Sequence, residues 1–347
     1  MKQVFRVFWG CTLAAALALT GCGRGGAPGS SGAGSMSGSG SGAMSGSTSG
    51  QEQAWRTGLG VVTEAAGSDR AGKITTAAAA VVLDADGRLA DVMLDELEIS
   101  ISAGSTGAVT TPEDVRSKRT KGADYPLAAA SSLGKGWAEQ ADHFADCLTG
   151  KTPDEVKKLK TDADGKPQDA DLLSGCTIAV DRYRDAVVRA CEQAKALGAA
   201  KGDTVSLNLL AADLPDDLTA TDDQDAHVRA DITLVALTVD GESRVTSAIG
   251  DMTQPQLTIS ADGTVSGPEA PVYTKNEQGD KYGMREASAL NKEWYEHAEG
   301  YCSYLKGKTM AEIAAIPTDG SDADLAALCT ISVTDLQKAA LAALAET

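Results

Sequence analysis

Apolar residues with strand-like spacing occur in two places in the main body of the chain. Lys73 to Leu83 is rich in Thr, Ala and Val, and Leu89 to Ile101 alternates loosely between apolar and polar residues. The turn-forming run Asp84-Ala-Asp86-Gly87 separates these segments, so together they predict a β-hairpin. The matching features of the second half are Val228 to Val239, Asp240-Gly241 and the apolar run from Arg244 onward. A second hairpin is expected at 102–104 and at 260–263.

Helical spacing of large residues follows each hairpin. Trp137 to Leu148 and Trp294 to Leu305 are predicted helices, and Gly150 and Gly307 are suited to end them. Thr152, followed by Pro153, is suited to cap the next helix. Thr309 to Glu312 fits a capping box and is expected to begin another helix. The final helix of each half is expected at about Val180 to Leu197 and at about Val333 to Leu344. The pattern predicts an α+β fold, with a small antiparallel sheet and packed helices in two tandem copies.

The two halves are also similar residue by residue. Tyr125 to Glu139 aligns with Tyr282 to Glu296, and the register continues without a gap to Gly150-Lys151-Thr152 and Gly307-Lys308-Thr309. Two shorter matches flank this block: Thr120-Lys121 with Thr274-Lys275, and Cys176-Thr177-Ile178 with Cys329-Thr330-Ile331. We interpret the body as an internal duplication, with copies at about 54–197 and 200–345.

The residues before the first copy are typical of an exported protein. Lys2 and Arg6 form a basic start, and Val7 to Ala18 is apolar but too short to span a bilayer. Leu19-Thr20-Gly21-Cys22 resembles a bacterial lipobox, which implies a signal peptide at 1–21 and lipid attachment, such as palmitate, at Cys22. An ordinary secretory signal with an incidental Cys is the alternative. Residues 22–53 are rich in Gly and Ser and are expected to form a flexible tether.

Composition excludes several classes of function. The formal net charge is −18, from 49 acidic against 31 basic residues, which argues against a nucleic-acid-binding protein. Gly150-Lys151-Thr152 lacks the earlier glycine of a phosphate-binding loop, because Ala145 stands there. Asp84 and Asp162 begin Asp-x-Asp-Gly runs without the glutamate of a calcium loop, so turns are expected. The histidines His143, His227 and His297 show no metal-ligand spacing, and His297 is expected to pair with Glu293 on a helix surface.

The most informative segment is Ser174-Gly175-Cys176-Thr177, which precedes the last helix of the first copy. If Thr177 stands at the N-terminus of that helix, unpaired N–H groups there would attract a phosphate. Its hydroxyl could also attack a phosphoryl centre. The alternative is that Thr177 only caps the helix.

This segment resembles the Ser-Gly-Ala-Thr segment of FMN-binding domains. The resemblance implies that the threonine carries FMN through a phosphoester, which an FMN transferase installs from FAD with magnesium. The shared blocks of both copies are similar to the tandem-repeat lipoproteins of Gram-positive extracellular electron transfer, over about residues 55–345. Position 176 is Cys rather than Ala, and Ala327-Leu328-Cys329-Thr330 lacks both Ser and Gly. We therefore rank Thr177, with Ser174 and Gly175, above Thr330 as the FMN-binding site.

Two further sets of residues leave alternatives open. A flavin could be walled by four aromatic residues, although their helical spacing favours core positions: Tyr125, Trp137, Tyr282 and Trp294. Lys135 and Lys292 could contact phosphate or be solvated.

Outside the signal and lipid cysteines, five cysteines remain. Cys147–Cys176 and Cys302–Cys329 would be matched disulfides, and Cys176–Cys191 is a competing pair.

The sequence predicts a lipid-anchored flavoprotein on the extracytoplasmic side of the cell membrane. It would shuttle electrons from a membrane donor on the quinone or NADH side, and would be a carrier rather than an enzyme with its own substrate. A binding or structural lipoprotein that kept the fold without flavin is the alternative. A hydrolase is disfavoured because no nucleophile–base set can be assembled.

Overall fold

The computed structural model describes residues 54–347, and these belong to one compact unit. The predicted signal peptide, Cys22 and the whole predicted tether at 22–53 lie outside the described residues. Within the described part of the chain, no helix is both long and apolar enough to cross a membrane.

The first half contains a four-stranded antiparallel sheet with strand order β1-β2-β3-β4. Its strands are β1 (Arg56–Ser68), β2 (Ala71–Leu83), β3 (Leu89–Ala103) and β4 (Val109–Thr110). The predicted hairpin is β2–β3, and its turn is held by Asp84 Oδ1, which accepts hydrogen bonds from the N–H groups of Asp86 and Arg88. The expected turn chemistry at Asp84 is therefore confirmed. β1 is an additional strand that the sequence pattern did not predict.

The second half contains two three-stranded sheets, with orders β5-β7-β8 and β10-β9-β6. The strands are β5 (Thr204–Ala211), β6 (Ala226–Arg229), β7 (Ile232–Val239), β8 (Val245–Thr253), β9 (Gln256–Ile259) and β10 (Val265–Ser266). The long strands β2 and β3 of the first half each correspond to two shorter strands in the second half. Ala230 and Asp231 separate β6 from β7, and Gln254 and Pro255 separate β8 from β9. Ala230 N–H donates to Pro255 O at 2.9 Å, so the two breaks lie side by side.

The helices follow the same order in both halves. Those of the first half are α1 (Lys118–Lys121), α2 (Leu127–Ala130), α3 (Trp137–Leu148), α4 (Pro153–Lys157), α5 (Ala170–Leu173) and α6 (Asp181–Gln193). Those of the second half are α7 (Lys275–Gln278), α8 (Trp294–Leu305), α9 (Met310–Ala314), α10 (Ala323–Ala326) and α11 (Thr334–Leu344). Short 3-10 helices lie at Gly122–Asp124, Gly279–Tyr282 and Arg285–Ala287. Helices and antiparallel sheets occur together, as the predicted α+β class requires.

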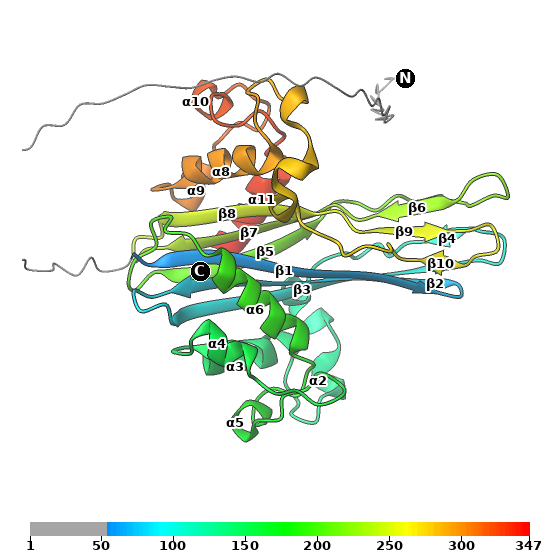
Figure 1. Ribbon diagram of the computed structural model, residues 1–347, viewed down its shortest axis with the longest axis horizontal. Coiled ribbons are helices and arrows are strands. Elements are labelled where there is room, and N and C mark those ends of the chain that lie inside the picture. The colour runs from blue at the N-terminus through cyan, green and yellow to red at the C-terminus, as the bar shows by residue number, and fades with distance from the viewer. Residues whose placement is uncertain (1–53) are drawn as a thin grey trace, which may run out of the picture. The chain divides into compact units, whose positions relative to one another are not determined.

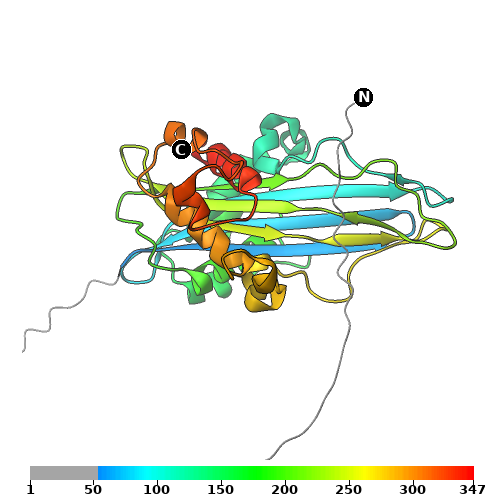
Figure 2. The ribbon, with the colours of Figure 1, turned by 90° about the horizontal axis from the view of Figure 1, so that it is seen from above.

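The elements form four layers, with the sheets inside and one set of helices on each outer face (Figures 1 and 2). Alternate residues of β2 explain this arrangement. Ala78, Ala80 and Val82 belong to a core between the sheets, which residues of both halves share. Ala77 and Ala79 belong to a second core under the first-half helices. A strand buried on both faces needs an uninterrupted apolar run, which β2 has. A third core lies under the second-half helices.

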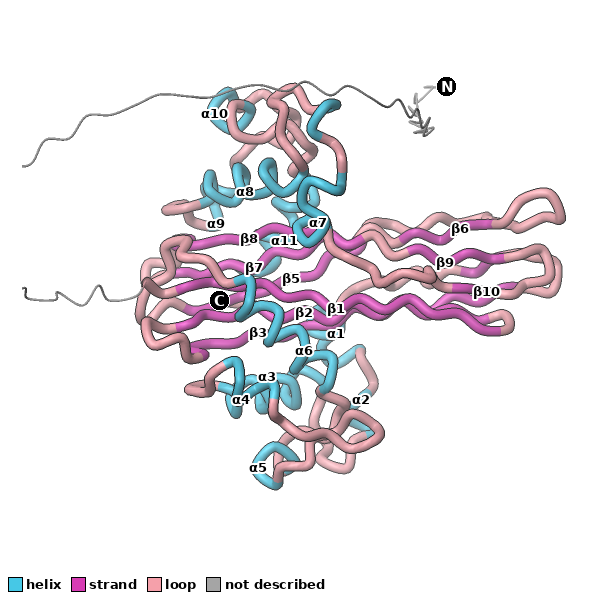
Figure 3. The backbone as a smooth tube through the Cα atoms, viewed as in Figure 1, coloured by secondary structure: helices cyan, strands magenta, loops and turns pink. Residues whose placement is uncertain are grey.

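Local signals for helix ends were read correctly. Gly150 and Gly307 have φ angles of 80° and 75° just beyond α3 and α8, in the region that glycine adopts most easily. Thr152 and Thr309 cap α4 and α9 through capping boxes. The Gly-Lys-Thr segments are therefore helix punctuation. Figure 3 shows α4 beside α3 and α9 beside α8, nearer the sheets than α5 and α10.

Two expectations about boundaries were wrong. Ser117 caps α1 as Thr274 caps α7, so Ser117-Lys118, and not Thr120-Lys121, is the structural counterpart of Thr274-Lys275. The last helix of the first half begins at Asp181 and ends at Gln193, short of the expected end at Leu197. The residues beyond it connect to the second half, and Lys195 exchanges backbone hydrogen bonds with Thr57 on β1.

Candidate functional site

Thr177 lies in a loop between α5 and α6, not at a helix N-terminus. Val180 is the N-cap of α6 and makes no capping hydrogen bond through its side chain. The expectation that Thr177 opens the helix, and the alternative that it caps the helix, are both wrong. A phosphate on Thr177 would therefore not be held by the first turn of α6. Ser174 is exposed and its hydroxyl donates to Asp171 O at 2.7 Å, while Gly175 is buried.

Gln140 on α3 holds this loop. Its Oε1 accepts from the Thr177 N–H at 2.9 Å and from the Thr177 hydroxyl at 3.1 Å. Its Nε2 donates to Ser131 Oγ and to Lys135 O, both at 3.0 Å. Gln140 is fully buried and Thr177 is half-buried. The Thr177 hydroxyl therefore has a fixed orientation on the outer face of the first half.

His297 takes the same place in the second half. Its Nδ1 accepts from the Thr330 N–H at 3.2 Å, so the ring proton is on Nε2, which donates to Ser288 Oγ at 2.8 Å. Burial and then Lys292 lower the pKa of His297, in agreement with a neutral ring. The expectation of a surface pair with Glu293 is wrong, because His297 is fully buried. Thr330 itself is exposed.

The two loops differ in how they pack on the central helix. A Cβ built on Gly175 would lie 2.3 Å from Cγ of His143, so this glycine is needed for close approach. In the second half, Gly300 of α8 replaces the histidine, and Leu328 replaces the glycine; a Cβ on Gly300 would lie 2.6 Å from Leu328 O. The bulky residue is on the helix in one half and on the loop in the other. Gly175 does not have a positive φ, so the close approach of His143, and not the backbone conformation, requires a glycine there.

The two lysines that could contact phosphate or be solvated differ in their surroundings. Lys292 Nζ donates to Leu328 O at 2.7 Å, two residues before Thr330. Lys135 occupies the equivalent position in the first half and is half-buried, and its side chain makes no hydrogen bond or ion pair among the described residues. Its backbone carbonyl accepts from Gln140, which also contacts Thr177, so Gln140 connects the backbone of Lys135 to the Thr177 loop.

The aromatic pairs that recur in both halves surround a buried lysine in each half. Trp137 and Trp294 are 2% and 5% exposed, so the core interpretation of these two residues holds. Lys118 Nζ lies 4.9 Å from the ring centre of Tyr125 and 2.6 Å from Glu96 Oε1. Although burial opposes the charge, Glu96 and Glu98 raise the pKa of Lys118.

Lys275, the counterpart of Lys118, lies 4.7 Å from the ring centre of Tyr282 and 5.0 Å from that of Trp294. Asp251 on β8 corresponds to Asp95 on β3, so Met252 occupies the position of Glu96. Lys275 therefore lacks the carboxylate partner that Glu96 provides to Lys118. Among the described residues, Lys275 makes no ion pair, although it is only 6% exposed. The first half therefore neutralises its buried lysine, whereas the second relies on aromatic rings.

All five cysteines of the described region are free thiols. Neither of the matched disulfides, nor the Cys176–Cys191 pair, is formed in this structure. Burial raises the pKa of Cys176 to about 11 and that of Cys191 to about 12, so both are protonated at neutral pH. Cys147 is half-buried and its Sγ lies 3.7 Å from His143 Nε2.

The remaining candidates for chemistry are structural. Asp162 Oδ1 accepts from the N–H groups of Asp164 and Lys166, as expected for a turn. No group of three metal-ligating side chains occurs within residues 54–347. Two cavities of about 830 and 450 Å³ lie elsewhere, and neither contains Thr177 or Thr330.

Gln140, His297 and His143 were not recognised as parts of the site from the sequence. The internal alignment offered one signal, since it places Gln140 and His297 at equivalent helix positions with interchangeable hydrogen-bonding ability.

Comparison with known proteins assigns no family. No family model matches the chain, and no solved structure matches it. A chlorophenol reductase of Desulfitobacterium hafniense is 50% identical over 40 residues, which is 12% of this chain and 12% of that protein. The chain thus matches only a small part of this curated relative, and the likeness is too short to indicate a shared activity.

Proposed function

We propose that this protein is a lipid-anchored electron carrier on the extracytoplasmic side of the membrane, with FMN attached to Thr177 through a phosphoester. Each half would be an FMN-binding-domain-like unit, anchored through Cys22. The supporting observation is the placement of the Thr177 hydroxyl. It is half-buried on an outer face, it is not used as a helix cap, and Gln140 orients it.

The surroundings of Thr177 fit a phosphate. Lys135 makes no side-chain ion pair among the described residues, and the reach of its counterpart Lys292 to Leu328 O supports a similar reach of Lys135 to the residues before Thr177. A phosphodiester carries negative charge, which a nearby ammonium stabilises. Bound FMN would supply reversible acceptance of electrons; Gln140 would fix the attachment point and Lys135 would neutralise the phosphate. The donor would be a membrane component on the quinone or NADH side, and an FMN transferase that uses FAD would make the bond.

The test is co-expression with an FMN transferase, followed by intact mass and in-gel flavin fluorescence under denaturing conditions. The wild type is expected to gain the mass of one attached FMN and to fluoresce. Thr177→Ala should lose both signals, whereas Thr177→Ser, which keeps a hydroxyl, should retain them. Thr330→Ala is the matched control from the second half and should behave as the wild type.

Bare mass and a dark gel for the wild type would refute flavin attachment and leave the alternative of a binding lipoprotein without flavin. Loss of flavin in Thr330→Ala alone would reverse the ranking of the two loops.

A further inference from the structure

In the first half, a chain of buried polar contacts joins Trp137 to Lys118. Trp137 Nε1 donates to the Tyr183 hydroxyl at 3.1 Å, and that hydroxyl is hydrogen-bonded to Glu96. Lys118 Nζ lies 2.6 Å from Glu96 Oε1, and Glu96 is only 2% exposed. One buried carboxylate therefore provides the partner of the lysine and, through a hydroxyl, completes the contacts of the indole N–H.

The second half keeps the two donors but not the two acceptors. The donors are Lys275 and Trp294, which are 6% and 5% exposed. Met252 replaces the carboxylate residue, and Leu336 replaces the tyrosine, since both are third in the last helix of their half. Within residues 54–347, neither Lys275 Nζ nor Trp294 Nε1 contacts a hydrogen-bond acceptor. Two nearly buried donors are therefore left without the partners that their counterparts have.

Both donor atoms remain within reach of a small molecule. The wholly enclosed polar atoms that lack a partner in the described part of the chain do not include Lys275 Nζ or Trp294 Nε1, so each of the two retains accessible surface. Met252 is half-buried, whereas Glu96 is almost fully buried, so the place of the missing carboxylate borders solvent. The unbranched thioether side chain adapts easily to a new neighbour. A small group can therefore enter beside Met252.

The donors are suited to a carboxylate. Lys275 Nζ lies 5.0 Å from the ring centre of Trp294 and 4.7 Å from that of Tyr282; we call these three residues the lysine cage. A carboxylate accepts through two oxygens, so a single one can serve both the ammonium and the indole N–H. The hydrogen bond to the ammonium is charge-assisted and hence the stronger of the two. The rings provide apolar walls for a short alkyl chain.

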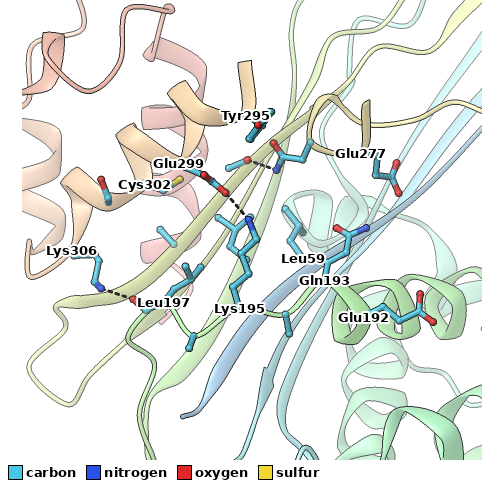
Figure 4. Close-up of a pocket in the computed structure, with 17 residues that line it drawn as sticks. Leu59, Glu192, Gln193, Lys195, Leu197, Glu277, Tyr295, Glu299, Cys302 and Lys306 are labelled. Carbon is cyan, nitrogen blue, oxygen red and sulfur yellow. Dashed lines mark hydrogen bonds and ion pairs between the residues drawn. The ribbon is translucent and has the colours of Figure 1, made fainter. Parts of the chain in front are cut away.

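Neighbouring acidic groups do not supply the missing acceptor, because they have partners of their own. Glu293 accepts from two backbone N–H groups of the preceding loop, at 2.9 and 3.1 Å. Glu277 pairs with Arg189 at 3.2 Å. Glu299 pairs with Lys195 across the cavity of about 830 Å³ between α8 and the segment 192–197 (Figure 4). The lysine cage is not part of the lining of that cavity.

We propose that the lysine cage binds the carboxylate of a small aliphatic monocarboxylate, in the place that the Glu96 carboxylate takes in the first half. One oxygen accepts from Lys275 Nζ and the other from Trp294 Nε1. The proposal does not depend on flavin attachment at Thr177. It gives the two halves different properties, because the first half carries its own carboxylate and the second takes one from solution.

The test follows the indole N–H signals of the full chain by NMR, after isotopic labelling of its tryptophans. Sodium acetate is the probe, and it replaces sodium chloride at constant ionic strength and neutral pH. The signal of Trp294, assigned with Trp294→Phe, should move downfield and saturate. The signal of Trp137, whose N–H already has a partner, should stay in place. No shift at Trp294, or equal shifts at both tryptophans, would overturn the site.

Two variants test the lysine and the empty acceptor position. Lys275→Met should weaken acetate binding at least about tenfold, because it removes the charged donor. Lys281→Met, an exposed lysine of the neighbouring 3-10 helix, is the matched control and should bind as the wild type does. Met252→Glu supplies the carboxylate of the first half, so its Trp294 signal should no longer respond to acetate. Well-dispersed indole signals show that each variant is folded. Unchanged acetate binding in either Lys275→Met or Met252→Glu would refute the proposal.

Discussion

In each half, one large and one small residue meet where the loop before the last helix packs on the central helix. The two halves place the large residue on opposite sides of this contact, and substitutions can test whether the two residues compete for one space. In the first half His143 lies against Gly175, and in the second half Gly300 lies against Leu328. Gly175→Leu would place a Cβ 2.3 Å from Cγ of His143, well inside the normal contact distance of about 3.5–4.0 Å. Overpacking of this kind costs about 1–3 kcal/mol of unfolding free energy.

His143→Gly alone should also destabilise the protein. It places glycine inside α3, at a cost of about 1 kcal/mol, and it removes the contact of His143 Nε2 with Asp171 O at 3.1 Å. The double variant reproduces the combination found in the second half. Because leucine then occupies the space that histidine leaves, we expect the double variant to be about 1–2 kcal/mol more stable than the sum of the single effects predicts.

The assay is urea unfolding of all four proteins, followed by tryptophan fluorescence, since Trp137 lies under the same helix layer. Equal m-values are required, so that changes in midpoint report changes in stability. His143→Gly combined with Ala129→Leu, an exposed position on α2, serves as the additive control. Additivity of the Gly175 and His143 substitutions, within about 0.5 kcal/mol, would show that the two residues do not compete for one space.

Three further predictions concern buried polar groups. Burial raises the pKa of Asp251 to about 7, above its ordinary value of 3.8, so the stability that it contributes is complete below about pH 4 and is lost as the pH rises through about 7; Asp251→Asn should therefore gain on the wild type between pH 4 and 8 in parallel thermal melts, and a constant difference would contradict this. Lys118→Met leaves Glu96 buried without its partner and should cost about 3–5 kcal/mol, whereas Lys275→Met, which strands no ion-paired carboxylate, should cost clearly less in urea unfolding; equal costs would argue against the asymmetry. His297→Gln copies Gln140 and should stay within about 1 kcal/mol of the wild type, while His297→Leu leaves the Thr330 N–H without an acceptor and should cost about 1–3 kcal/mol; equal stability of the two variants would show that this hydrogen bond is unimportant.

Elements with local signals were predictable from the sequence, and contacts between distant segments were not. Trp137–Leu148 was predicted to its exact ends, because a glycine stop and a Thr-Pro cap follow it directly. Thr177 was misplaced because a Ser-Gly turn followed by Thr fits a helix start as well as a loop. Only the fold shows that Gln140, 37 residues earlier, takes both donors of Thr177. The face of β2 that packs between the sheets could not be assigned either, since its alanines and valines are apolar on both faces.

The layer order has a consequence for the proposed carrier. The threonine loops belong to the helical layers on opposite outer faces, with both sheets between them (Figure 1). Packed sheets lie about 10 Å apart, and each helical layer adds a similar thickness. Two flavins, one on each loop, would be too far apart to touch, so the duplication would not create an electron path through the molecule. The loops have in fact diverged, with Gln140 at one, and with His297 and an engaged Lys292 at the other. A carrier with a single flavin on Thr177 would take and give electrons at the same outer face, so its partners would have to use that face in turn, and substitutions near Thr330 should leave electron transfer unchanged.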